Sequence, residues 1–363
     1  MNLFRKGKKY PLGIDISDVS LKMVQLSKGR KGKIGLKAIN DTDLPLETIV
    51  NGEIKDEDTV VKNMKKLVSK SKLSKPDSNR VVASLPESKT FIKLIRIKDT
   101  TNKLEDIIET EMEKHIPFSP RDVYYNWQII EDRKEHRLVL IGVSPKNIVE
   151  QYYNVFSQAG LIVEALEIEP VALCRAVLEE ETPIFEDARG KNYIIIDVGF
   201  SHSTIIFYSQ NTILFTTETQ LSGEKITREL SEKLNVSRSK AEKYKTSLSK
   251  KNKDYKKIIE IIQGNLEELN IKLGRAVDFY YDNFSDRGPL ESVILVGGGA
   301  YTQGLQESID CLPASIDIER GNSLFKVSRG KKAKKVFEQQ EDSLRFATAV
   351  GLALSKVFIK DKE

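Results

Sequence analysis

Two aspartates stand at the ends of apolar runs, where a carboxylate could bind a hard cation. Asp15 follows Leu12-Gly13-Ile14, and Asp197 follows Ile194-Ile195-Ile196. After each aspartate come a short polar segment and a second apolar run, a pattern typical of two buried strands joined by a turn. Carboxylate oxygens suit Mg²⁺, and the N–H groups of a turn can face an anion. The two hairpins therefore predict a duplicated fold that holds one charged ligand.

A run of three glycines is the third feature that could bind a nucleotide. Gly297, Gly298 and Gly299 follow the apolar segment Val293–Val296 and precede a helix predicted from near Thr302. Glycine lets the backbone approach adenine, ribose or phosphate, and the dipole of the helix favours phosphate. A tight turn alone would also explain the glycines. Their place after two aspartate hairpins favours a nucleotide site, and no Walker-type phosphate loop is present.

The elements that must position Asp15 form half of a mixed α/β domain. The apolar patterns predict strands over Leu12–Leu26 and Lys33–Ile39 and a further strand over Arg80–Ser84. Between them, apolar residues at helical spacing predict a helix over Asp58–Leu73, with Asp58 or Thr59 as its N-cap.

An inserted module follows, with the element order β-α-β-β-α-β that is typical of a split βαβ unit. It begins with the strand Phe91–Ile97 and ends with the strand Leu161–Ile168, which could instead belong to the parent domain. The module contains no constellation of carboxylates and histidine. An insertion of this kind predicts partner binding rather than catalysis.

The second half of the chain repeats the strand pattern around Asp197 and adds helices. A connecting helix is predicted over Pro170–Leu178, and a polar linker over Thr182–Lys191. Lys257–Phe284 has one apolar face at helical spacing and predicts a long helix. Leu344–Phe358 predicts an apolar terminal helix, in which small residues allow close backbone approach: Ala347, Ala349, Gly351 and Ala353.

Composition indicates a protein with more than one domain and a heavily solvated surface. The chain has 363 residues, of which 39% are hydrophobic and 31% charged. A net charge of +5 does not indicate a general nucleic-acid binder, although basic residues cluster in several segments. Two cysteines are too few for a disulfide framework. With no long apolar span and no signal peptide, we expect a cytoplasmic protein.

These motifs together resemble the superfamily of actin, Hsp70 and sugar kinases. Gly13–Lys22 resembles its first phosphate loop, Asp197–Thr204 the second and Val293–Gly299 the adenosine motif, while Glu167–Val177 and Ala347–Leu354 resemble the two connecting helices. The resemblance implies an α/β fold of duplicated actin-like (ribonuclease H-like) domains with an inserted split βαβ subdomain of the 1C type.

The resemblance also implies domain boundaries. The first actin-like domain (1A) is expected over 1–86, with the inserted subdomain (1C) over 87–155 and the return to 1A over 156–180. The second domain (2A) is expected over 181–220 and 289–340, the helical subdomain (2B) over 221–288, and a terminal helix that packs on 1A over 341–363.

Within that superfamily the chain resembles the PilM family of type IV pilus assembly proteins, relatives of FtsA. The motifs that carry this resemblance are the basic start before Leu12, Glu113–Phe118, Tyr125-Asn126-Trp127, and Gly223–Thr227 followed by Ala241-Glu242. The resemblance implies an ATP-binding scaffold at the inner face of the membrane, which binds the cytoplasmic N-terminal peptide of a PilN-like membrane protein and couples it to other pilus machinery. The residues after Phe358 are too few for the terminal membrane helix of FtsA-like proteins.

The resemblance assigns roles to particular residues. Asp15 and Asp197 would hold Mg²⁺ through water, and Glu242 and Lys245 would contact ribose and adenine opposite the glycine run. An ion pair on an exposed helix face would explain Glu242 and Lys245 equally well. The whole expected ATP-binding set is Asp15, Ser17, Ser20, Lys22, Asp197, Gly199, Ser201, His202, Ser203, Gly223, Lys225, Glu242, Lys245, Gly297, Gly298, Gly299 and Thr302.

One residue departs from the family pattern. Where glycine and serines are usual after the first aspartate, this chain has Ser17-Asp18-Val19-Ser20. The charge of Asp18 would weaken phosphate binding unless its carboxylate points away or faces Mg²⁺. No general base can be assigned, since His202 is a candidate by position only, so ATP hydrolysis is expected to be slow or absent.

Two other functions are compatible with the same scaffold. A sugar-type kinase would need an aspartate base beside the acceptor hydroxyl, and no further aspartate motif supplies one. A filament-forming bacterial actin is the other alternative, and self-association is left open.

Overall fold

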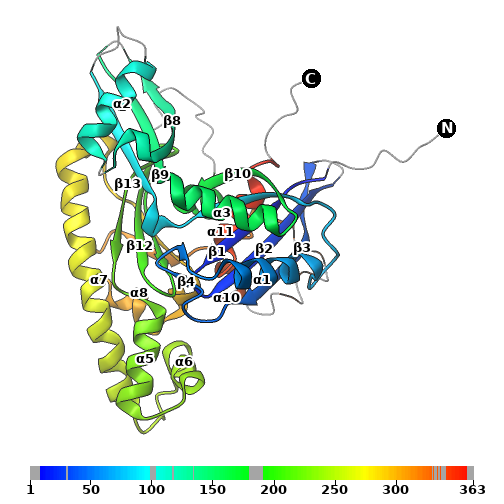
Figure 1. Ribbon diagram of the computed structural model, residues 1–363. Coiled ribbons are helices and arrows are strands. Elements are labelled where there is room, and N and C mark those ends of the chain that lie inside the picture. Colours follow the sequence, from blue (N-terminus) through cyan, green and yellow to red (C-terminus); the bar gives the residue numbers. More distant parts are fainter. Residues whose placement is uncertain are drawn as a thin grey trace. The chain divides into compact units, whose positions relative to one another are not determined.

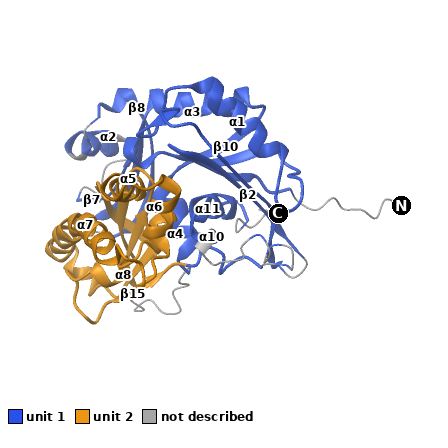
Figure 2. Ribbon diagram, turned by 90° about the horizontal axis from the view of Figure 1, so that it is seen from below, with its two compact units in different colours: residues 1–179, 322–363 blue, residues 180–321 orange. Residues whose placement is uncertain are grey.

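The computed structural model describes residues 9–29, 32–98, 104–116, 118–133, 135–179, 191–328, 330, 333, 336 and 341–357. The basic residues before Lys9, most of the polar linker and the tail after Val357 lie outside this part. The chain divides into two compact units, drawn in separate colours in Figure 2. Unit 1 comprises residues 1–179 and 322–363, and unit 2 comprises residues 180–321.

Unit 1 is built on a five-stranded sheet with the strand order β10-β6-β1-β2-β3. β1 pairs antiparallel with β2 and parallel with β6, so the hairpin predicted around Asp15 is confirmed. β10 pairs with β6 and therefore belongs to the parent sheet, as the alternative reading of the insertion allowed. The strands are β1 (Leu12–Ser17), β2 (Ser20–Lys28), β3 (Ile34–Asp43), β6 (Arg80–Leu85) and β10 (Ile162–Ile168).

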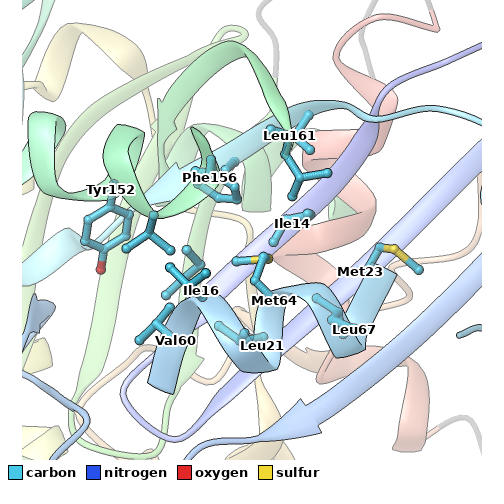
Figure 3. Close-up of a cluster of buried hydrophobic side chains, with 14 of the residues drawn as sticks. Ile14, Ile16, Leu21, Met23, Val60, Met64, Leu67, Tyr152, Phe156 and Leu161 are labelled. Carbon is cyan, nitrogen blue, oxygen red and sulfur yellow. The ribbon is translucent and has the colours of Figure 1, made fainter. Parts of the chain in front are cut away.

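Two helices cover one face of this sheet, and Figures 1 and 2 show both on the same side. They are α1 (Glu57–Ser69) and α3 (Lys146–Gln158), which pack on each other. Their apolar stripes form a buried core with the sheet, where Met64 of α1 and Phe156 of α3 are completely buried (Figure 3). A short hairpin, β4 (Ile49–Val50) and β5 (Glu53–Ile54), precedes α1.

The opposite face carries α4 (Glu169–Val177) and the terminal helix α11 (Ala347–Leu354). The predicted close approach is confirmed at two glycines. A Cβ at Gly13 would lie 2.2 Å from the carbonyl oxygen of Ala349, and one at Gly351 would lie 1.8 Å from that of Ala172. Only glycine fits at either position, because the backbone of α11 contacts β1 and α4 directly. The helix is shorter than predicted and follows a four-residue helix, α10 (Glu341–Leu344).

The rest of the insertion contributes three neighbouring strands in the order β7-β9-β8, which are called the inserted sheet below. Its elements are β7 (Phe91–Ile97), α2 (Leu104–His115), β8 (Val123–Asp132) and β9 (Arg137–Pro145). α2 packs against one face of the sheet, where Ile108 and Met112 meet Val139 and Ile141 in a separate buried core. The other face of the sheet is turned away from α2.

Unit 2 contains a five-strand array ordered β15-β14-β11-β12-β13. The hairpin predicted around Asp197 is confirmed, since β11 pairs antiparallel with β12 from Asn192 to Ser209. Both strands are buried along most of their length, as expected for such apolar runs. The strands are β11 (Asn192–Val198), β12 (Ser203–Ser209), β13 (Thr212–Thr219), β14 (Ser292–Val296) and β15 (Asp317–Arg320).

Helices of unit 2 include the long helix that the sequence predicts. It is α7 (Tyr255–Asn283), which packs on β13 and on α5. The others are α5 (Gly223–Leu234), α6 (Arg238–Thr246) and α8 (Leu305–Ser308). No helix in the described part of the chain combines the length and the apolar composition that crossing a membrane requires.

Two local predictions are wrong. The N-cap of α1 is Asp56 rather than Asp58 or Thr59, because the Asp56 carboxylate accepts the Thr59 N–H at 3.0 Å. The helix expected from near Thr302 begins at Leu305, since residues 298–301 form a 3₁₀ turn.

The finer domain boundaries stay predictions. Unit 1 resumes at Asn322, inside the range expected for the second domain.

Candidate nucleotide and peptide sites

Asp15 sits in a buried polar cluster at the end of β1. Lys22 is its cross-strand partner on β2, and the Lys22 ammonium contacts Asp15 Oδ2 at 2.8 Å. Ser84 of β6 donates to Asp15 Oδ1 at 3.4 Å. Asp15 is only 4% exposed, so this carboxylate is held by neighbours from two strands. The sheet thus brings together Asp15 and Lys22, two of the predicted site residues.

The turn from Ser17 to Ser20 is closed by its own serines. Ser17 Oγ donates to the Ser20 carbonyl at 3.0 Å and lies 3.0 Å from Ser20 Oγ. These contacts fix the turn next to Asp15, and Ser20 is 7% exposed. Whether its N–H groups hold phosphate stays a prediction.

Asp18, the departure from the family pattern, is directed at another loop. Its two carboxylate oxygens accept the N–H groups of Asn51 and Gly52, at 3.2 and 3.0 Å. Both donor residues, Asn51 and Gly52, form the turn of the β4–β5 hairpin, with φ of 48° and 75°. The sequence allows two orientations of the Asp18 carboxylate, away from the phosphates or toward Mg²⁺. The observed bonds direct the carboxylate to a protein N–H pair.

Asp197 is the penultimate residue of β11 and lies beside the glycine turn. It pairs with Thr204 on β12 and with Val296 on β14, the residue before Gly297. Gly297 has φ of 83°, and a Cβ there would lie 2.0 Å from Asp197 Oδ1. Only glycine allows the turn to pass this close to the carboxylate.

The turn after Asp197 is tied to the start of α5. Gly199 N–H donates to the His202 carbonyl at 3.1 Å, and the Gly199 carbonyl accepts the Gly223 N–H at 3.0 Å. The Ser203 hydroxyl donates to the Leu221 carbonyl at 2.7 Å, so it serves to join β12 to the same loop. Ser201 and His202 are half-buried in this turn.

Lys245 and Glu242 do not form an ion pair on an exposed helix face. The Lys245 side chain is 5% exposed, whereas that of Glu242 is 52% exposed. Lys245 Nζ lies 2.8 Å from Glu242 Oε2, 3.1 Å from Thr227 Oγ1 and 3.2 Å from the Gly223 carbonyl oxygen. The ammonium therefore joins α6 to the first turn of α5. Thr227, which the sequence analysis did not single out, is the shared partner of both charged groups.

Lys225 is directed toward α7 instead, where its ammonium contacts Glu268 at 3.2 Å. Unit 2 thus brings the predicted residues of the second phosphate loop, α5, α6 and the glycine turn into one region. Asp15 belongs to the other unit, so a joint role of Asp15 and Asp197 on one Mg²⁺ stays a prediction. In the described residues no cluster of three or more His, Cys, Asp or Glu side chains could hold a metal by itself.

Two observations at the glycine turn fit a bound nucleoside. A Cβ built on Gly298 would meet nothing within 4 Å, so the backbone there borders open space. The buried Thr302 hydroxyl has no hydrogen-bond partner within the described part of the chain. Gly299, in contrast, packs against Val198, because a Cβ there would lie 2.4 Å from Val198 Cγ1. The open position at Gly298 is where a ring or ribose could approach.

Unit 1 contains an apolar cleft beside the inserted strands, for which the sequence predicted partner binding without a location. It encloses about 530 Å³ on the face of the β7-β9-β8 sheet that α2 leaves uncovered. The facing wall is formed by the end of β10 and the start of α4. The lining residues are Leu85, Ile92, Tyr124, Tyr125, Asn126, Trp127, Gln128, Leu140, Gly142, Val143, Ser144, Val149, Leu166, Glu167, Ile168 and Val171.

A few polar groups accompany this apolar lining. The Ser144 side chain is buried, and its hydroxyl has no hydrogen-bond partner among the described residues. Asn126 and Gln128 lie two residues apart on the edge strand β8 and are exposed. Glu167, in contrast, is held by Arg175 at 2.7 Å. An apolar cleft with a few hydrogen-bonding groups suits a peptide with apolar side chains. The sequence motif that lies in this cleft is Tyr125-Asn126-Trp127.

Several known proteins are similar to this chain. A cell division protein FtsA from Enterococcus hirae is 32% identical over 106 residues, which are 29% of this chain and only 23% of that protein. The structure of MreB 5 of Spiroplasma citri bound to AMPPNP has a TM-score of 0.52 at 11% identity, covering 93% of this chain and 98% of that one.

The structure of a PilM–PilN type IV pilus biogenesis complex has a TM-score of 0.79 at 22% identity, covering 96% of this chain and 98% of that one. These likenesses establish an actin-like α/β fold. The family model described as type IV pilus assembly protein PilM matches residues 13–357, nearly the whole chain. The chain therefore belongs to the PilM family of type IV pilus assembly proteins.

Proposed function

We propose that the chain is an ATP-binding scaffold that binds the cytoplasmic N-terminal peptide of a PilN-like inner-membrane protein. The observation that carries the peptide part is the apolar cleft of unit 1, on the uncovered face of the inserted sheet. A similar structure is that of a PilM–PilN complex, which supports a partner of this kind. Membrane association would then come through the partner.

Leu140, Val149 and Ile168 come from three elements and offer apolar surface to side chains of an extended peptide. The Ser144 hydroxyl and the side-chain amides of Asn126 and Gln128 can bond to peptide N–H and C=O groups, which would otherwise lose their hydrogen bonds with water. β8 is the edge strand of its sheet. Its side chains line the cleft.

The proposed nucleotide is ATP with Mg²⁺. Asp15 and Asp197 would hold the cation through water, and the N–H groups of the turns at 17–20 and 199–203 would bind phosphate. A similar structure contains AMPPNP, which supports the nucleotide class. The bound cation would offset the charge of the phosphates. Gly298 would border the nucleoside, with Gly223, Glu242 and Lys245 on the side of α5 and α6.

The test is a titration of the chain with the fluorescein-labelled N-terminal peptide of the PilN-like protein from the same organism, read by anisotropy. We expect saturable binding that the unlabelled peptide competes away and that a scrambled peptide does not. Failure of the labelled peptide to bind would reject the scaffold role. Membership of the PilM family does not favour the sugar kinase or the filament-forming alternative.

A further inference from the structure

Unit 1 carries a dense group of lysines on α1 and on the segment that follows this helix. From Thr59 to Pro76 the sequence contains six lysines and no acidic residue, arginine or aromatic residue. All six lysines are exposed. One of them, Lys72, forms an ion pair with Asp41, whereas the other five form none within the described part of the chain. These five are called the lysine face below: Lys62, Lys65, Lys66, Lys70 and Lys75.

The packing of α1 turns its three lysines to the outside. Met64 and Leu67 of this helix are completely buried in the core that it shares with the sheet (Figure 3). Lys62, Lys65 and Lys66 are spaced three and four residues apart, so they share one exposed side of the helix. The helix thus presents three like charges on a single surface.

The other two lysines are held beside α1 by the edge of the sheet. The segment after α1 runs along β3, which is the edge strand of the five-stranded sheet. The Lys72 N–H donates to the Ile39 carbonyl at 2.9 Å, and a second backbone hydrogen bond to β3 follows two residues later. Lys70 and Lys75 flank these bonds. The lysine face therefore continues from α1 onto the sheet edge.

The neighbouring acidic residues do not balance this charge. Asp58 and Asp77 are the acidic residues that flank the segment in the sequence. Asp58 lies in the first turn of α1, where the helix dipole favours a carboxylate, and Asp77 is paired with Lys37. Asp41, the partner of Lys72, also binds Arg345.

The lysine face carries an electrostatic cost in the free protein. Like charges three or four residues apart on a helix repel each other, as Lys62 does with Lys65 and with Lys66. Elsewhere in the chain the same spacing is used for an ion pair, in which Lys233 contacts Glu229 at 2.7 Å. The helix dipole favours Lys66 in the last turn of α1, but the other two lysines of the helix precede that turn. An anionic partner would relieve the repulsion.

The residue types favour a lipid surface over a nucleic acid as this partner. Lysine is a flexible point charge that suits phosphates spread over a plane. Nucleic-acid sites add arginine forks to phosphates and bases, or aromatic rings that stack on bases, and Thr59–Pro76 contains neither. The proposed peptide partner is also a membrane protein, and α1 packs on α3, which carries Val149 on the cleft wall.

We propose that the lysine face binds the anionic headgroups of a membrane surface directly, as a contact separate from the one with the PilN-like peptide. Each basic residue at an anionic lipid surface strengthens binding by about fivefold. The attraction extends over about one Debye length, so added salt weakens it. The lipid contact requires neither bound nucleotide nor bound peptide, and it can therefore be tested independently of the proposed function.

The experiment is co-sedimentation of the full chain with vesicles that contain no protein. One set of vesicles has equal parts of phosphatidylglycerol and phosphatidylcholine, and the other has phosphatidylcholine alone. We expect the wild type to bind only the anionic vesicles and to be released by salt. The triple variant Lys62→Gln, Lys65→Gln, Lys66→Gln should bind them at least about 10-fold more weakly. Because glutamine forms helices about as well as lysine, the variant should stay folded, which circular dichroism checks.

The matched control removes the same number of charges from unit 2. Lys243, Lys256 and Lys272 are exposed lysines of α6 and α7, spread along the two helices. Replacing all three with glutamine gives the same net charge, and we expect vesicle binding within about 3-fold of wild type. Affinity for the PilN-like peptide should be unchanged in both triple variants, since none of the six lysines lines the cleft.

Several results would overturn the proposal. Equal losses in the two triple variants would show that net charge, not the lysine face, governs the binding. Wild-type binding in the Lys62, Lys65, Lys66 variant would place the lipid contact elsewhere on the chain. Failure of the wild type to bind anionic vesicles, or tighter binding to a labelled DNA duplex at the same salt concentration, would exclude a lipid surface as the partner. Each of these results would leave the peptide-binding scaffold role intact.

Discussion

Leu140→Arg is expected to weaken binding of the PilN-like peptide by roughly 10-fold or more, which anisotropy titration measures directly. Leu140 lies on β9, lines the cleft and does not belong to the buried core that α2 shares with the same sheet. Losing one apolar contact surface costs about 1.5–3 kcal/mol, and an arginine placed among apolar walls adds a desolvation cost. The protein should remain folded, since Leu140 is only half-buried.

Ile129→Arg is the matched control. Ile129 is an apolar residue of the neighbouring strand β8 that is 40% exposed and does not line the cleft. The same change of charge at Ile129 should leave peptide affinity within about 2-fold of wild type. Equal losses in the two variants would point to the added charge rather than to the cleft, and wild-type affinity in Leu140→Arg would place the peptide elsewhere.

Asp197→Ala is expected to abolish detectable binding of Mg-ATP, measured with a fluorescent ATP analogue. Asp197 is the acidic end of β11 and lies against the backbone of the glycine turn, where Gly297 leaves just enough room for its carboxylate. Without this carboxylate the water molecules around the cation would lose a charged hydrogen-bond acceptor, so the cation would be held less firmly beside the triphosphate. Binding in the presence of EDTA should already be weak in the wild type.

The control for this prediction is Asp278→Ala, which removes an exposed aspartate of α7 in the same unit. Its affinity for the analogue should match that of the wild type, and circular dichroism should show both variants folded. Unchanged affinity in Asp197→Ala would remove the second hairpin from the nucleotide site altogether.

The hairpins could be predicted because continuous apolar runs around a short polar centre have few other structures available. Asp15 and Asp197 both lie where that pattern put them, at the ends of β1 and β11. The partner of Asp18 could not be predicted, because Asn51 and Gly52 are more than thirty residues away in the sequence. The burial of the Lys245 side chain could not be predicted either. It depends on how α6 packs on α5, where Thr227 and the Gly223 carbonyl supply its acceptors.

The cleft was the hardest feature to predict, because its walls come from seven strands and helices spread over residues 85–171. The sequence predicted the insertion, but it did not decide whether the last strand belongs to the inserted module or to the parent domain. In the structure β10 pairs with β6 and therefore belongs to the parent sheet. Ile168 of β10 also packs against Gly142 of β9, where a Cβ would lie 2.8 Å from Ile168 Cδ1. Only the packed structure shows that the face of the inserted sheet opposite α2 borders the cleft.

The most direct test of the scaffold role is site-specific photo-cross-linking of the PilN-like peptide to benzoylphenylalanine placed at Tyr124 or at Tyr153. Tyr124 lines the cleft and is 49% exposed, whereas Tyr153 is 53% exposed on α3 and does not line it. We predict a peptide adduct from position 124 and none from position 153. An adduct from position 153 alone, or equal adducts from both, would show that the peptide binds outside the cleft.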